Sequence, residues 1–185
     1  MLAPDLLPSA RLLVVDDEDS NLLLVDRLLR SAGVQDVHLL TDPRAVVERC
    51  IALEPDVVLL DLHMPHVDGV EVLHALHHAL PPDRFLPVLV LTADATPQAR
   101  RRALEAGAKD FLAKPLERDE LLLRVRNQVE TAALYRRVQA ENRRLKAELD
   151  QQERALLEVE EELDRARARV LQVLHHDGIQ MVFQP

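Results

Sequence analysis

Short apolar runs alternate with longer amphipathic stretches through the first two thirds of the chain. Runs of about five apolar residues are typical of strands that are buried on both faces of a parallel sheet. The stretches between them repeat their apolar residues at helical spacing, and Gly33 stands where a left-handed cap would end the first helix. The runs predict strands at residues 11–15, 37–40, 56–61, 87–92 and 109–113. This alternation predicts an α/β fold with a doubly wound parallel sheet.

Polar side chains stand at the C-terminal ends of four of these runs. Asp16 and Asp17 follow the first run, Asp61 closes the third, Thr92 closes the fourth, and Lys114 follows the fifth. Because the carboxyl ends of parallel strands meet at one edge of the sheet, we expect these side chains to converge. The pattern therefore predicts a site that combines carboxylates with a hydroxyl and an ammonium group.

These groups suit metal-assisted phosphoryl chemistry. Mg²⁺ prefers oxygen ligands, which Asp17 and Asp61 can supply, with Asp16 acting directly or through water. An aspartate carboxylate can also attack phosphorus, and we assign this role to Asp61. Lys114 would neutralise the incoming charge, and the Thr92 hydroxyl would donate to a phosphoryl oxygen. A helix-capping role is the structural alternative for the Asp16–Asp17 pair.

The last third of the chain has the composition of one long helix. Residues 117–174 are rich in Ala, Leu, Glu, Arg and Gln and contain neither Gly nor Pro. A heptad repeat typical of a left-handed coiled coil can be laid along it. Its a positions are Tyr135, Asn142, Leu149, Leu156, Leu163 and Val170, and its d positions are Val138, Leu145, Gln152, Val159, Ala166 and Val173. We expect a homodimer, which Asn142 at an a position favours as a parallel one; a single solvated helix is the alternative.

Composition limits the remaining possibilities. At 185 residues the chain has room for one domain and one additional element. A formal net charge of −9 argues against a general nucleic-acid binder, which needs a basic surface. The lone Cys50 excludes an internal disulfide and fits a reducing compartment. Since neither a secretory signal nor an apolar stretch of membrane-spanning length is seen, we expect a soluble, cytoplasmic protein without a membrane partner.

Four motifs stand in the order and spacing of one known family. They are Val-Val-Asp16-Asp17-Glu, Leu-Leu-Asp61-Leu-His-Met64-Pro65-His-Val-Asp68-Gly69, Leu-Thr92-Ala-Asp and Ala-Lys114-Pro115. Together they resemble the receiver domain of two-component response regulators over residues 10–125. This leaves residues 1–9 as an N-terminal tail and residues 126–174 as the coiled coil. The resemblance implies a flavodoxin-like (βα)5 sheet with strand order 2-1-3-4-5.

The resemblance also implies roles for the site residues. Asp61 would be the phosphoacceptor for a sensor histidine kinase. Mg²⁺ would be held by Asp17, by Asp61 and by the backbone carbonyl of His63, with Asp16 acting through water. Thr92 would contact the phosphoryl group, as would Lys114.

The same resemblance extends to two residues near the fifth strand. Phe111 would be the aromatic switch residue that moves with Thr92, although by residue type alone a Phe is most simply core. The peptide bond between Lys114 and Pro115 is expected to be cis.

The final residues resemble the start of another domain. Residues 175–185, with Asp177-Gly-Ile-Gln-Met-Val-Phe-Gln-Pro185, are similar to the opening strand of EAL-type cyclic-di-GMP phosphodiesterase domains. The catalytic carboxylates of such a domain are missing, so we expect a regulator rather than an enzyme. The leading hypothesis is a phosphorylation-controlled module that signals through a dimeric coiled coil to a C-terminal effector. The alternatives are a constitutive dimeric scaffold or phosphate sink, and a different effector such as a cyclase or an HD-type phosphodiesterase.

Overall fold

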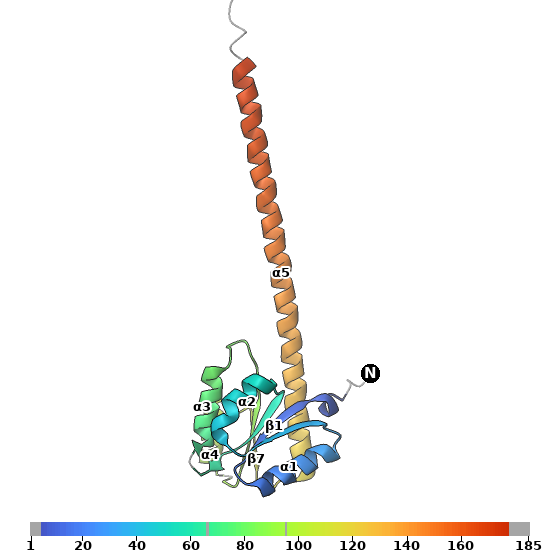
Figure 1. Ribbon diagram of the computed structural model, residues 1–185, viewed down its shortest axis with the longest axis vertical. Coiled ribbons are helices and arrows are strands. Elements are labelled where there is room, and N and C mark those ends of the chain that lie inside the picture. The colour runs from blue at the N-terminus through green and yellow to red at the C-terminus, as the bar shows by residue number, and fades with distance from the viewer. Residues whose placement is uncertain (1–4, 66, 95, 178–185) are drawn as a thin grey trace, which may run out of the picture. The chain divides into compact units, whose positions relative to one another are not determined.

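The structure is a computed structural model that describes residues 5–65, 67–94 and 96–177 (Figure 1). By their internal contacts the residues fall into two units, an α/β domain that ends at Arg137 and a helical segment that begins at Val138. Each unit is described by itself below. Within the described ranges, no helix combines the length and the apolar character needed to cross a membrane.

Five parallel strands form the sheet of the α/β domain in the order β2-β1-β3-β6-β7. They are β1 (Arg11–Val15), β2 (Asp36–Leu40), β3 (Val57–Asp61), β6 (Val88–Thr92) and β7 (Asp110–Ala113). Counted in chain order, the parallel strands follow the arrangement 2-1-3-4-5, so the predicted fold class and strand order are confirmed. A small antiparallel hairpin follows β3 and was not predicted. It consists of β4 (His63–Met64) and β5 (Val67–Asp68).

Helices and short turns connect the strands and cover both faces of the sheet. They are η1 (Leu7–Ser9), α1 (Asp19–Ser31), η2 (Pro43–Ala45), α2 (Val46–Leu53), α3 (Gly69–Ala79), α4 (Pro97–Glu105) and α5 (Arg118–Asp177). Two helix ends follow the sequence signals closely. Gly33 takes a positive φ of 89° after α1, and the Thr96 hydroxyl accepts a hydrogen bond from the Ala99 N–H at the start of α4.

Alternate residues of each strand contribute to two separate cores. In β1, Leu12 and Val14 pack against apolar residues of α1 and of the first part of α5. Leu13 and Val15 face the other side, where α2, α3 and α4 close a second core around the fully buried Cys50. Burial on both faces is why the strands read as unbroken apolar runs in the sequence.

The residues before β1 also belong to a core. Leu7, in η1, is fully buried in the cluster that α1 and α5 share. The Asp5 carboxylate supports this turn, because it accepts a hydrogen bond from the Leu7 N–H at 3.2 Å and pairs with Arg126 of α5 at 3.4 Å. Residues 5–9, which we assigned to an N-terminal tail, therefore pack against the α/β domain.

The part of α5 that belongs to the α/β domain is held by more than its apolar face. The ring of Tyr135 stacks on Phe85 with 4.9 Å between the ring centroids. The ammonium group of Lys109 lies over the ring of Phe85. One residue further on, Arg136 forms an ion pair with Asp56, just before β3. Tyr135, the first a position of the predicted heptads, thus makes a contact within its own domain.

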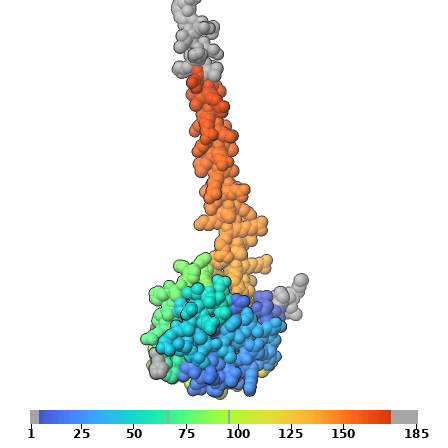
Figure 2. Space-filling view, viewed as in Figure 1, coloured from blue at the N-terminus to red at the C-terminus, as the bar shows by residue number. Residues whose placement is uncertain are grey.

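From Val138 to Asp177 the helix runs for about 60 Å, at 1.5 Å per residue. Figure 2 shows side chains projecting from this segment, coloured orange to red. The apolar a and d residues are largely exposed: Val138 by 57%, Leu145 by 48%, Leu149 by 58%, Leu156 by 63%, Val159 by 57%, Leu163 by 50% and Val170 by 58%. A row of exposed apolar residues at this spacing marks a surface suited to protein–protein contact.

Candidate functional site

Three carboxylates meet at the C-terminal edge of the sheet. Asp16 follows β1 and is 2% exposed, Asp61 ends β3 and is 3% exposed, and Asp17 is half-buried beside them. One oxygen atom from each of the three lies within 4.8 Å of the others. In the part of the chain that the structure describes, this is the one group of three or more His, Cys, Asp or Glu residues close enough to share a metal ion.

Lys114 binds two of these carboxylates at once. Its Nζ lies 2.8 Å from Asp16 Oδ2 and 2.8 Å from Asp61 Oδ1. Burial alone would lower the pKa of Lys114, but the hydrogen bonds and charges of Asp16 and Asp61 outweigh it, so the pKa is raised above its ordinary value. The side chain therefore remains a cation at neutral pH.

Backbone and side-chain donors bind the other carboxylate oxygen of Asp61 and of Asp16. Asp61 Oδ2 accepts a hydrogen bond from the His63 N–H at 3.0 Å. Asp16 Oδ1 accepts one from the Glu18 N–H and one from Asn21 Nδ2, both at 3.0 Å. We did not single out Asn21 from the sequence, where nothing separates it from other polar residues on a helix surface.

The charge balance of the cluster favours a divalent cation. Asp16, Asp17 and Asp61 carry three negative charges and Lys114 one positive charge, which leaves two negative charges uncompensated. The Asp17 carboxylate makes no hydrogen bond or ion pair with any other residue that the structure describes. Hard oxygen donors in this number fit Mg²⁺, which is usually held by one or two carboxylates and retains several waters.

The Thr92 hydroxyl is part of a second set of contacts beside the carboxylates. Thr92 ends β6 and is fully buried. Its Oγ1 lies 3.0 Å from His63 Nδ1 and accepts a hydrogen bond from the Asp94 N–H at 3.1 Å. The Thr92 carbonyl accepts the Lys114 N–H at 2.7 Å, which ties the ends of β6 and β7 together. The peptide bond that follows Lys114 is cis, as expected.

Gly69 lets the chain turn tightly behind the site. A Cβ at this position would lie 2.7 Å from the Asp61 carbonyl oxygen and 2.7 Å from Leu62 Cα. Both neighbours are backbone atoms of the segment that carries Asp61, so they could yield only by displacing it. A side chain at residue 69 is therefore incompatible with α3 beginning where it does.

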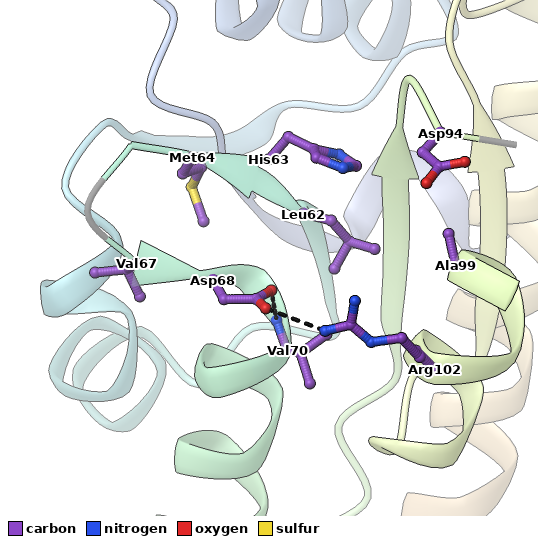
Figure 3. A pocket seen from close by; sticks show the side chains of 9 residues that line it. All are labelled: Leu62, His63, Met64, Val67, Asp68, Val70, Asp94, Ala99 and Arg102. Atoms are coloured by element: carbon purple, nitrogen blue, oxygen red, sulfur yellow. Dashed lines mark hydrogen bonds and ion pairs between the residues drawn. The ribbon is translucent and has the colours of Figure 1, made fainter. Parts of the chain in front are cut away.

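A cavity of about 420 Å³ opens next to this edge of the sheet (Figure 3). Apolar residues such as Leu62 and Met64 line it together with polar side chains. Arg102 of α4 reaches across to Asp68 at 3.4 Å, so an ion pair joins α4 to the cap of α3.

The structure therefore brings four of the predicted site residues, Asp16, Asp17, Asp61 and Lys114, into one cluster. Thr92 stands close by, linked to the cluster through both His63 and Lys114. Phe111 lies on β7 opposite Val90. It is half-buried and packs against the core to which α2, α3 and α4 contribute. Of the effector-like segment at residues 175–185, residues 178–185 lie outside the described residues.

Comparison with known proteins agrees with this geometry. The sensory/regulatory protein RpfC of Xanthomonas campestris is 39% identical over 115 residues, which are 62% of this chain and 16% of RpfC. The signal transduction histidine-protein kinase BarA of Shigella flexneri is 38% identical over 109 residues, 59% of this chain and 12% of BarA. This chain thus corresponds to a small part of these relatives.

A solved structure of similar fold is a chain of the CheX–CheY–BeF₃–Mg²⁺ complex from Borrelia burgdorferi. It is 28% identical, with a TM-score of 0.58, over 63% of this chain and 86% of that one. Residues 12–126 also match the family model of the response regulator receiver domain. Because this match covers more than half of the sequence and the fold agrees with it, the chain belongs to the response regulator receiver domain family.

Proposed function

We propose that this chain receives a phosphoryl group on Asp61 and uses it to control a C-terminal effector. The observation that carries the proposal is the position of Lys114, whose ammonium group bridges the buried carboxylates of Asp16 and Asp61. This places a fixed positive charge where a phosphoryl group on Asp61 would add negative charge. The bound Mg²⁺ would supply further charge neutralisation, held by Asp17, Asp61 and the carbonyl of His63, with Asp16 acting through water.

The phosphoryl donor is proposed to be a sensor histidine kinase. A carboxylate oxygen of Asp61 attacks the phosphorus, the P–N bond of the donor phosphohistidine breaks, and the leaving imidazole keeps the electron pair and takes up a proton. BarA, which contains a similar sequence, supports a donor of this class because it is a histidine-protein kinase by name. The Borrelia complex, which holds BeF₃ and Mg²⁺, supports the same ligand chemistry.

The response to phosphorylation is proposed to involve Thr92 and Phe111. The Thr92 hydroxyl would turn to a phosphoryl oxygen, and Phe111, half-buried on the neighbouring strand, would move with it. Since Phe111 packs against the core beneath α4, its movement would alter that face of the domain.

The output is proposed to pass through a parallel homodimer of the helical segment. The exposed residues Val138, Leu145, Leu149, Leu156, Val159, Leu163 and Val170 support this, together with Asn142 between them. We infer that the effector beyond the coil is a cyclic-di-GMP phosphodiesterase, on the resemblance of residues 175–185. A cyclase or an HD-type phosphodiesterase is the alternative.

Phosphate transfer to two variants tests the acceptor assignment. Asp61→Asn should take up no phosphate from acetyl phosphate with Mg²⁺, because an amide cannot form the acyl phosphate. Asp42→Asn, whose exposed carboxylate pairs with Arg44 near the same edge, is the matched control and should be labelled like the wild type. The measurement is the phosphorylated fraction by intact-protein mass spectrometry. Robust labelling of Asp61→Asn would refute the assignment.

A second comparison separates the regulator from a constitutive scaffold or phosphate sink. Sedimentation of the whole chain with and without beryllofluoride would show whether the phosphoryl mimic changes the dimer equilibrium. A change supports a switch, whereas an equally stable dimer in both states supports the scaffold.

A further inference from the structure

The Thr92 hydroxyl lies within hydrogen-bond distance of an imidazole nitrogen. A threonine hydroxyl donates one hydrogen bond and can accept two. Oγ1 already accepts from the Asp94 N–H at 3.1 Å, which uses a lone pair and leaves the hydrogen free to point elsewhere. Among the described residues, His63 Nδ1 lies within reach at 3.0 Å, and it accepts the hydroxyl hydrogen when the imidazole carries its proton on Nε2. Since Thr92 is fully buried, we assign the tautomer in which its hydroxyl donates to the imidazole.

His63 is held in place independently of this contact. Its backbone N–H donates to Asp61 Oδ2 at 3.0 Å, and its position in β4 is paired with Asp68 of β5. Figure 3 shows the imidazole extending from the hairpin toward the end of β6, with Asp94 on the far side of the cavity mouth. The hairpin thus presents a hydrogen-bond acceptor to Thr92 from a backbone that is tied to the phosphoacceptor itself.

We propose that His63 is a positioning residue that holds the Thr92 hydroxyl in its unphosphorylated arrangement, in competition with the phosphoryl group. This rests on the proposed function, in which Thr92 donates to a phosphoryl oxygen on Asp61. A single hydrogen cannot serve both acceptors, so the hydroxyl leaves Nδ1 when it turns to the phosphoryl group. Removing the imidazole therefore favours the phosphorylated arrangement, because the hydroxyl no longer has to give up its hydrogen bond to Nδ1.

Binding of beryllofluoride measures this competition directly. The chain contains no Trp, so the bound fluoride signal in ¹⁹F NMR is the suitable readout, titrated with beryllium at saturating Mg²⁺ and excess fluoride. We expect His63→Ala to lower the half-saturating beryllium concentration by about three- to tenfold, the equivalent of one net hydrogen bond. His63→Asn should restore the wild-type value, because Asn Oδ1 occupies the same place along the side chain as His Nδ1.

The Thr92→Val background shows whether His63 acts through the hydroxyl. Valine keeps the shape of Thr92 and lacks the hydrogen, so His63→Ala should change beryllofluoride binding by less than about twofold in that background. An equal gain in both backgrounds would mean that the imidazole only obstructs access, and would overturn the proposal. Unchanged or weaker binding in His63→Ala alone would overturn it as well.

Failure of the wider proposal would look different. If the wild type bound no beryllofluoride and accepted no phosphate on Asp61, the proposed function itself would be wrong. If the wild type did both and His63→Ala behaved like it, only the role of His63 would be refuted.

Discussion

A single ammonium group lies between two carboxylates that are almost completely buried. Lys114 binds both Asp16 and Asp61 at 2.8 Å, while Asp17 remains without a partner among the described residues. Buried charges are tolerated when they are paired and hydrogen-bonded, and this cluster meets that condition for two of its three carboxylates. Because the pKa of Lys114 is raised, the pairing persists throughout the neutral range.

Cys50 gives the stability of the domain a dependence on alkaline pH. Burial raises the pKa of the Cys50 thiol to about 11, from an ordinary value of 9.0. Between these values the unfolded chain loses the thiol proton while the folded protein keeps it, so the free energy of unfolding falls as pH rises. The predicted loss is up to roughly 2 kcal/mol across this interval.

Urea unfolding between about pH 8 and pH 11 checks this prediction. Cys50→Ala is the matched variant, since it lacks the thiol and leaves every other titrating group in place. The difference in unfolding free energy between the wild type and Cys50→Ala should shrink toward pH 11. A constant difference over the range would contradict the burial argument.

At the scale of elements, the turn before β1 is a structural part of the domain. Leu7 is fully buried in the apolar cluster that includes residues of α1 and α5, so we expect its side chain to stabilise the fold as a core residue does. We predict that Leu7→Ala lowers the free energy of unfolding by about 2–4 kcal/mol. Leu23→Ala, at a leucine of α1 that is 51% exposed, should change it by less than about 0.5 kcal/mol.

Thermal or urea unfolding of the two variants makes the comparison. Similar losses for both would show that residues 5–9 do not pack as described. A loss for Leu7→Ala alone would confirm that this turn belongs to the cooperative unit.

Some elements could be predicted from the sequence because their signals are local. The unbroken apolar runs indicated the parallel strands, and the rule that strand ends meet at one edge placed Asp61 and Lys114 together. Other features depend on contacts that sequence spacing does not encode. Leu7 lies in a short segment without periodicity, and Asn21 resembles any polar helix residue until its contact with Asp16 is seen.

Tyr135 illustrates a further limit of sequence patterns. Its spacing fits the first a position of the heptads, and it fits equally a contact with its own domain. In the structure the ring stacks on Phe85. A repeat of apolar residues shows which face of a helix is apolar, but not which surface packs against it.

At the scale of the whole molecule, dimerisation is the property that the proposal depends on most. Leu156 and Leu157 are neighbours that are 63% and 59% exposed, yet only Leu156 falls on the a/d seam. We predict that Leu156→Asp converts the proposed dimer to a monomer, because each chain would lose a leucine contribution of roughly 1.5–3 kcal/mol at the interface. Leu157→Asp should remain dimeric.

Sedimentation equilibrium over a range of concentrations distinguishes these outcomes. For Leu156→Asp, the dissociation constant should rise by at least about a hundredfold. Equal weakening by both substitutions would show that association does not use the heptad seam, and a monomeric wild type would refute the dimer.

The stack of Tyr135 on Phe85 has a practical consequence for studying the protein. The chain contains one Tyr and no Trp, so Tyr135 is its sole strongly fluorescent side chain. It stands against the α/β domain only a few residues before the helical segment begins. Its emission and its near-ultraviolet dichroism would therefore report on the end of the α/β domain, close to the start of the helical segment, without any attached label.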